Sequence, residues 1–195
     1  ELDGVDIDGE NPGMSGDGNL FRPEDNEHYT NLFKDLRQWL DSLGRITHKK
    51  YFVTTAVGGS MDYIEHTEMS QVQLYTDYIN VMSYDYDESG DSLSSHHTNL
   101  YVSGDNSRIN SADQSIRNLI NAGVPPNKIV MGIAFYGKGQ QMATTDNHGL
   151  YRKTLKPQRG GGFSYINDSL MNRNGFVRYW DSKAKAPYLF NADKK

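Results

Sequence analysis

The feature that most limits the possible folds is an alternation of short apolar segments with longer amphipathic ones. The apolar segments are rich in β-branched and aromatic residues and lie at residues 3–10, 51–57, 78–86 and 128–137. Runs of this kind are typical of strands buried on both faces, which occur in parallel sheets covered by helices. The alternation therefore predicts a parallel sheet with right-handed crossover connections.

The stretches between the strands predict helices. Residues 23–43 begin with Pro23 and an acidic turn and are followed by Gly44, the usual signals for a helix start and stop. Residues 111–122 have the same 3.6-residue period and are followed by Gly123. We expect residues 13–21 to form a glycine-rich loop and residues 61–75 to be helical or irregular.

Four parallel strands are too few to close a barrel but match half of a (β/α)8 TIM barrel. Functional residues of such barrels lie at the carboxyl ends of the strands. Polar residues gather at these ends, at Asp8-Gly9-Glu10, Tyr84-Asp85 and Tyr136-Gly137. The sequence thus predicts an α/β fold, an incomplete TIM barrel of about strands four to seven, with a site at this edge.

The composition changes near residue 140, where aromatic residues and the glycines of residues 160–162 replace the alternation. We therefore predict two parts, residues 1–139 as a partial barrel and residues 140–195 as a small α+β subdomain. Because the chain begins directly with a strand and without methionine, we interpret it as a segment of a longer protein.

Composition excludes several classes of protein. The net charge is −5 and the basic residues are dispersed, so we expect no nucleic-acid partner. No apolar run approaches the roughly 20 residues that cross a bilayer, so we expect no membrane partner. The chain has no cysteine, which excludes disulfides and thiolate metal sites.

Three carboxylates occupy alternate positions of the first strand, Asp6, Asp8 and Glu10. Alternate residues of a strand share a face and lie roughly 6.5–7 Å apart. Like charges this close resist simultaneous ionisation, so we expect at least one group to hold its proton, as acid catalysis requires. A calcium loop is the weaker alternative, because its register would need ligands at Gly4 and Ser15.

Five segments, in order along the chain, resemble the catalytic domain of family 18 chitinases. They are DGVDIDGE, which is similar to the DGxDxDxE signature of that family, INVMSYDY, SSHHTNLY, GIAFYGKG and NGFVRYWDSKAKAPYLFN. The resemblance implies a chitinase barrel carrying an α+β insertion domain. It implies chitin or chito-oligosaccharides as substrate, no metal or organic cofactor, secretion from the cell, and a monomer.

The resemblance also implies a role for each motif residue. Glu10 would be the general acid, Asp8 would orient the 2-acetamido group of the substrate as internal nucleophile, and Asp6 would share a proton with Asp8. Tyr84 and Asp85 would contact the acetamido group and the sugar. The remaining substrate-binding candidates are Met82, Tyr136, Trp180 and Tyr188.

Other interpretations remain open at several of these positions. Met82 and Tyr84 are also plausible core residues, and Trp180 is also interpretable as core of the insertion. Gly9 stands where the family usually has tryptophan, so we expect Glu10 to be held less firmly. Further departures are Asn11, Asn99 and Lys138. Gly9, Asn11 and the missing barrel strands favour the second function, a catalytically silent chitinase-like carbohydrate-binding protein.

Overall fold

The computed structural model describes residues 2–16, 18–87, 92–103 and 110–194. The chain forms two compact units. Unit 1 comprises Glu1–Met82 and Gln114–Gly132, and unit 2 comprises Ser83–Asp113 and Ile133–Lys195. None of the described helices is long and apolar enough to cross a membrane.

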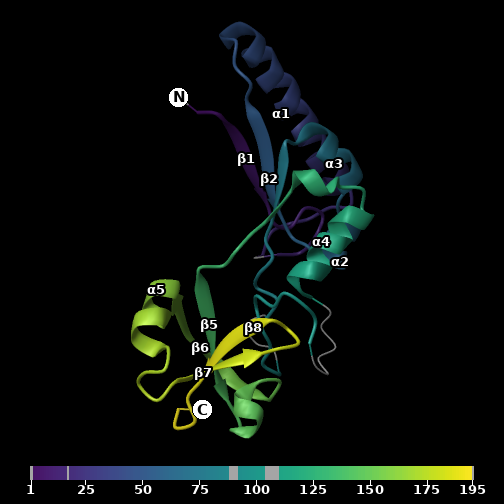
Figure 1. Cartoon of the computed structure of the whole chain (residues 1–195). Helices are drawn as coiled ribbons and strands as arrows, with labels where there is room; N and C mark the ends of the chain where they lie inside the picture. Colours follow the sequence, from purple (N-terminus) through teal and green to yellow (C-terminus); the bar gives the residue numbers. More distant parts are fainter. Residues whose placement is uncertain (1, 17, 88–91, 104–109, 195) are drawn as a thin grey trace. The chain divides into compact units, whose positions relative to one another are not determined.

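The elements of unit 1 are four strands with helices between them (Figure 1). In chain order they are β1 (Gly4–Gly9), α1 (Asp25–Thr47), β2 (Phe52–Val57), α2 (Met61–Glu65), α3 (Met69–Tyr75), β3 (Tyr78–Val81), α4 (Ala112–Asn121, whose first two residues belong to unit 2), the 3-10 turn η1 (Pro126–Lys128) and β4 (Ile129–Met131).

The four strands form one parallel sheet in the order β1-β2-β3-β4. Asp6 is opposite Thr54, Thr54 is opposite Tyr78, and Ile79 is opposite Ile129. This confirms the predicted parallel sheet with helical crossovers. The described residues form an open sheet of four strands and no closed barrel.

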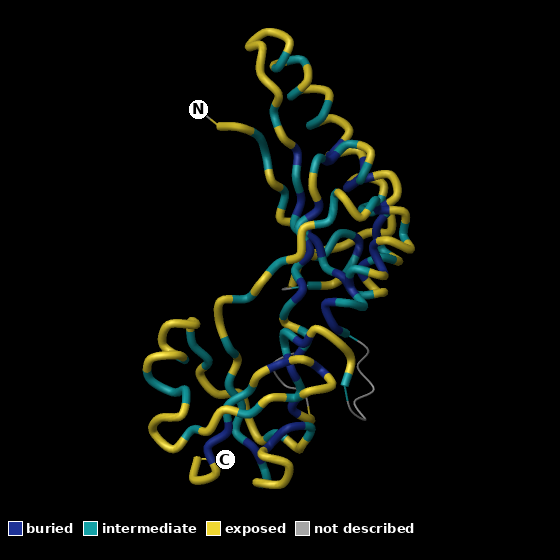
Figure 2. Tube along the Cα trace, in the orientation of Figure 1, coloured by how far each residue is buried: buried dark blue, intermediate teal, exposed yellow. Residues whose placement is uncertain are grey.

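One face of this sheet is buried beneath the helices, which all lie on the same side of it (Figures 1 and 2). The core contains fully buried side chains from the strands and from each helix, because alternate strand residues point toward the helices. Its members are Tyr29, Phe33, Val53, Val57, Tyr63, Met69, Val72, Ile79, Val81, Leu119 and Val124.

Three predicted boundaries are wrong. The helix predicted to end before Gly44 continues to Thr47 and ends at His48, which has a left-handed φ of 54°. Gly44 therefore lies within the helix. A side chain does not fit at this position, because its Cβ would lie 2.5 Å from the Lys49 carbonyl oxygen. The strand predicted at residues 78–86 ends at Val81, and Asp85 has a φ of 60°, which an extended strand cannot accommodate.

The strand predicted at residues 128–137 is also wrong, because it consists of two elements. β4 covers only Ile129–Met131, and a different strand starts at Tyr136 and pairs with an antiparallel partner in unit 2. That strand spans residue 139, where we predicted the boundary between two domains; the boundary itself stays a prediction.

Unit 2 contains two separate antiparallel pairs, β5 with β6 and β7 with β8. Its elements are β5 (Tyr136–Met142), the 3-10 turn η2 (Asp146–Gly149), β6 (Thr154–Gly162), α5 (Phe163–Tyr165), the π-type turn η3 (Ile166–Leu170), β7 (Val177–Asp181) and β8 (Ala186–Phe190). The glycines at 160–162 lie within β6, where they allow the chain to pass against β5: a Cβ at Gly160 would overlap the Gly137 carbonyl.

A half-buried carboxylate, Asp181, joins distant segments of unit 2. It accepts hydrogen bonds from His96 Nε2 at 3.2 Å, Ser103 Oγ at 2.9 Å and Tyr151 OH at 3.1 Å, and from two backbone N–H groups of the β7–β8 turn. Burial alone would raise the pKa of Asp181, but these donors outweigh it and lower the pKa to about 2.

A second half-buried carboxylate, Asp77, ties α1 to the sheet of unit 1. Its Oδ2 accepts from Arg37 Nη1 and from the Val53 N–H, each at 3.0 Å, and Lys50 Nζ lies 2.8 Å from Oδ1. Burial would raise the pKa of Asp77, but the bonds and charges of these partners lower it below the ordinary 3.8. The ionised form is therefore the one that the fold stabilises.

We predict that Asp77→Asn lowers the free energy of unfolding by about 1–3 kcal/mol at pH 7, because charged hydrogen bonds are lost. Since the pKa is lowered in the fold, this contribution is present above pH 3.8 and is lost as the pH falls further. Denaturant melts from pH 7 to pH 3 should show the gap between wild type and variant closing.

Asp41→Asn is the matched control, because Asp41 also pairs with Arg37, at 2.8 Å, but is 54% exposed. We expect a change within about 0.5 kcal/mol. Equal effects of the two variants would contradict the anchoring role of Asp77.

Candidate active site

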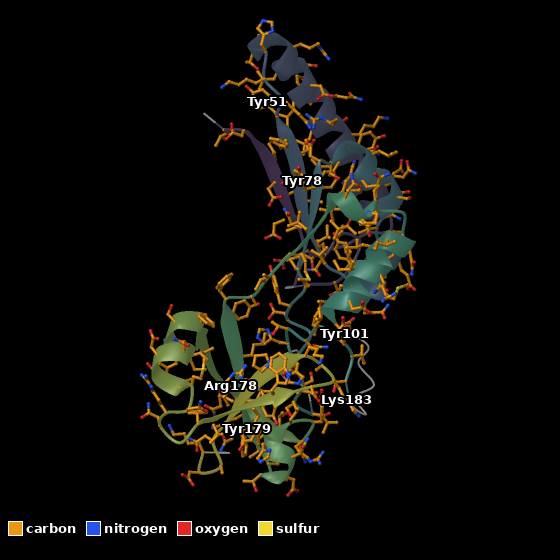
Figure 3. All side chains as sticks on the ribbon, in the orientation of Figure 1. Tyr51, Tyr78, Tyr101, Arg178, Tyr179 and Lys183 are labelled. Atoms are coloured by element: carbon orange, nitrogen blue, oxygen red, sulfur yellow. The ribbon has the colours of Figure 1, made fainter. Side chains whose placement is uncertain are left out.

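The three carboxylates of the first strand lie where the strand alternation predicts. Asp6 and Asp8 are exposed on the sheet face opposite the helices, and Glu10 is exposed directly after β1. Thr54, Tyr78 and Asn80 belong to the same face on neighbouring strands; Tyr78 is labelled in Figure 3. We call these residues the carboxylate face, comprising Asp6, Asp8, Thr54, Tyr78 and Asn80.

Asp6 is fixed by donors from two neighbouring strands. Its Oδ1 accepts a hydrogen bond from Thr54 Oγ1 on β2 and one of 3.2 Å from Asn80 Nδ2 on β3. These bonds orient the carboxylate across the sheet. The sequence analysis missed both donors, although polar residues within the otherwise apolar runs FVTTAV and YINV were a usable signal.

Gly9 is buried in the structure. Its carbonyl accepts a 2.8 Å hydrogen bond from Tyr63 OH, and the Tyr29 phenol covers its Cα. A hydrogen bond and a neighbouring ring thus restrain the backbone of this glycine, and the expectation that Glu10 is held less firmly stays a prediction.

The site residues of unit 2 converge on Asp85. Tyr136 OH donates to Asp85 Oδ2 at 2.7 Å, and Lys138 Nζ pairs with Oδ1 at 2.9 Å. His97 Nδ1 lies 3.6 Å from the same oxygen, and the Tyr84 ring packs edge-on to Tyr136 with centroids 6.2 Å apart. Three residues expected from sequence, Tyr84, Asp85 and Tyr136, are thus neighbours.

These partners set the charge of the cluster. Burial would raise the pKa of Asp85, but the bonds from Tyr136 and Lys138 and the charges of Lys138 and His97 lower it below its ordinary value. Burial raises the pKa of Tyr136, and its bond to Asp85 raises it further. The tyrosine therefore remains a donor and the aspartate an anion at neutral pH.

The backbone of Asp85 is strained as well. Its φ of 60° lies in the left-handed region, which aspartate tolerates better than most residues. Such strain costs on the order of 1–3 kcal/mol and persists only where surrounding contacts enforce it. Tyr136 and Lys138 are such contacts, because both hold the carboxylate from β5.

The remaining candidates, Met82, Trp180 and Tyr188, have other contacts. Met82 follows β3, and its N–H donates to the Val57 carbonyl at 2.9 Å. Trp180 on β7 is 51% exposed beneath the Arg178 guanidinium, labelled in Figure 3, so its interpretation as core is wrong. Tyr188 on β8 stacks on Tyr179 with ring centroids 5.4 Å apart.

Among the residues that the structure describes, no group of three or more histidine and acidic side chains could hold a metal ion. His96 and His97 instead have separate partners. His96 bonds to Asp181, and His97 faces Asp85 and packs against the Tyr136 ring at 5.3 Å.

We predict that Tyr136→Phe and Lys138→Met each raise the pKa of Asp85, because each removes a donor to its anionic form. Carboxyl 13C NMR titration measures this directly. Tyr165→Phe is the control, since Tyr165 is exposed and on another element. An Asp85 pKa unchanged in both test variants would contradict the assigned network.

Comparison of the chain with known proteins identifies its family. The family model described as glycosyl hydrolases family 18 matches residues 1–195. Chitinase A1 of Niallia circulans is 35% identical over 209 residues, covering 100% of this chain and 30% of that protein.

Solved structures agree. A family 18 N-acetylglucosaminidase from Paenibacillus barengoltzii has a TM-score of 0.94 at 40% identity, covering 98% of this chain and 57% of that one. A chitinase from Bacillus thuringiensis has a TM-score of 0.93 at 33% identity, covering 98% and 34%. The chain thus spans between about a third and just over half the length of these relatives, and it belongs to glycosyl hydrolase family 18.

Proposed function

We propose that the protein containing this chain is a chitinase that hydrolyses β-1,4-N-acetylglucosamine linkages in chitin and chito-oligosaccharides with retention. The observation that carries the proposal is that Asp6 and Asp8 are exposed on the sheet face away from the helices, with Glu10 exposed directly after the same parallel strand. Membership of family 18 and the names of the relatives support it.

In the first step Glu10 donates its proton to the glycosidic oxygen as the bond from that oxygen to the anomeric carbon breaks. The substrate's own acetamido carbonyl oxygen attacks the anomeric carbon, which makes this family an exception to the two-carboxylate pattern. Asp8 accepts a hydrogen bond from the acetamido N–H and stabilises the positive charge of the oxazolinium-type intermediate. Asp6, held by Thr54 and Asn80, sets the charge beside Asp8.

In the second step the ionised Glu10 takes a proton from water, and that water attacks the anomeric carbon. The acetamido oxygen leaves, so the two inversions give net retention. In this proposal Tyr84 and Asp85 act on the acetamido group and the sugar, while Met82, Tyr136, Trp180 and Tyr188 contribute to substrate binding.

The architecture and the setting are part of the same proposal. The four parallel strands would be strands four to seven of the family's TIM barrel, and residues 140–195 its α+β insertion domain. The substrate is extracellular and insoluble, which favours a secreted enzyme; we propose a monomer that needs no cofactor.

A catalytically silent carbohydrate-binding protein is the second candidate. Gly9 and Asn11 beside the acid favour it, because both depart from the pattern of the family. Retention of all three carboxylates favours the enzyme, since binding alone does not need a proton donor.

We predict that Glu10→Gln lowers kcat of the full-length protein on chito-oligosaccharides by at least about 10²–10⁴-fold, because the amide cannot donate a proton to the leaving oxygen. Reducing-end release is the measurement. Glu65→Gln, an exposed change on α2, should leave kcat unchanged. Full activity of the Glu10 variant would refute this assignment of the acid. If the wild-type protein binds chito-oligosaccharides but does not cleave them, the silent carbohydrate-binding protein is favoured.

We also predict that fully deacetylated chitosan oligomers are not cleaved, because they lack the internal nucleophile. Chromatography of the products from matched acetylated and deacetylated hexamers tests this. Equal cleavage of the two would show that a protein side chain is the nucleophile.

A further inference from the structure

Three buried hydroxyl groups lie directly behind the carboxylate face. Tyr29 from α1, Thr55 from β2 and Tyr63 from α2 are 8%, 0% and 2% exposed. Tyr63 OH donates to the Gly9 carbonyl at 2.8 Å, and Thr55 Oγ1 donates to the Ile7 carbonyl at 2.9 Å. We call these three residues the hydroxyl cluster.

The direction of each bond follows from counting protons. A hydroxyl group has one proton to donate and two lone pairs to accept with. The protons of Thr55 and Tyr63 are used on backbone carbonyls, so Tyr29 is the donor to Thr55 Oγ1 at 2.9 Å, with the Tyr63 oxygen 3.3 Å away. The protons of Thr55 and Tyr63 are thus directed toward carbonyls of β1, and the proton of Tyr29 is directed toward Thr55.

The two carbonyls belong to the peptide groups that directly precede the proposed catalytic residues Asp8 and Glu10. The Ile7 carbonyl is in the peptide joined to the nitrogen of Asp8, and the Gly9 carbonyl is in the peptide joined to the nitrogen of Glu10. Because a peptide group is planar, fixing its oxygen fixes the Cα that follows. The bond from Tyr63 therefore restrains the backbone from which the Glu10 side chain projects.

Tyr63 is itself firmly held. Its N–H donates to Ser60 Oγ at 3.1 Å, and its carbonyl accepts from Thr67 Oγ1 at 2.8 Å. Burial raises the pKa of its phenol well above the ordinary value, so the donor proton is retained at alkaline pH.

Gly9 makes room for this arrangement. A Cβ on Gly9 would overlap the Tyr29 hydroxyl and lie 2.7 Å from its Cζ. Tyr29 cannot move aside without losing its bond to Thr55 and its edge-on contact with Phe33, whose ring centroid is 4.8 Å away.

We propose that Tyr63 is a positioning residue for Glu10: its buried hydroxyl, bonded to the Gly9 carbonyl, holds the peptide that orients the acid. The inference rests on the proposed function for its effect on catalysis, whereas the hydrogen bond can be tested without any activity.

The kinetic test is Tyr63→Phe in the full-length protein. We expect kcat on chito-oligosaccharides to fall by about 10- to 100-fold, as for a small misplacement of a catalytic group, with KM within about twofold. The limb of the kcat–pH profile that reports Glu10 should also shift. Tyr75→Phe, at the margin of the same core, is the matched control and should match wild type in both respects. Wild-type kcat and pH profile in Tyr63→Phe would overturn the proposal.

The spectroscopic test uses the 195-residue chain. Gly9-Glu10 is its single Gly-Glu pair, so labelling with 1-13C glycine and 15N glutamate gives one peptide signal. Tyr63→Phe should move the Gly9 carbonyl resonance upfield. Site-specific 3-fluorotyrosine at position 63, a stronger donor of the same shape, should move it downfield even if the phenylalanine variant fails to fold. A resonance unmoved by 3-fluorotyrosine overturns the proposal, whereas a shifted resonance in a protein without chitinase activity rejects only the proposed function.

Discussion

The parallel pairing of β1 with β2, from Gly4 opposite Phe52 to Gly9 opposite Val57, is the constraint on which the rest of unit 1 depends. Because side chains alternate, this register gives one face to the helices and the other to the carboxylates. A slip by one residue would place Asp6 and Asp8 in the core, where unpaired charges cost several kcal/mol. The hydrophobic core and the bond from Thr54 to Asp6 therefore fix the same register from opposite faces.

The acidic groups of this protein fall into two classes with different surroundings. Asp77, Asp85 and Asp181 are held by several donors each, and their lowered pKa values mean that the fold needs their charge. Asp8 and Glu10 are exposed at a strand end, so the fold leaves them accessible to a substrate. Acid conditions should therefore weaken the hydrogen bonds and ion pairs of Asp77, Asp85 and Asp181.

The sequence predicted the parallel sheet and β1 correctly and the start of α1 to within two residues, because apolar period and helix-start signals are local. It failed at β5 and β6, since the β6 residues Lys156, Gln158 and Arg159 lack an apolar period and glycines occupy the end of that strand. It identified Asp6 but not its partners Thr54 and Asn80, which only the strand register brings within reach. The hydroxyl cluster had no local signal, because it joins residues up to 54 positions apart.

Gly9 departs from a family pattern, and the structure shows which side chains pack beside it. Replacing a usual tryptophan by glycine indicates lost packing beside the acid, and on an unchanged backbone that loss would cost about 3–5 kcal/mol. In this protein the phenol of Tyr29 fills the space, and Tyr63 bonds to the backbone that the glycine exposes. The packing is thus supplied by α1 and α2 instead of β1. It follows that residues 9 and 29 are coupled, since a large side chain at 9 fits only if Tyr29 is also replaced.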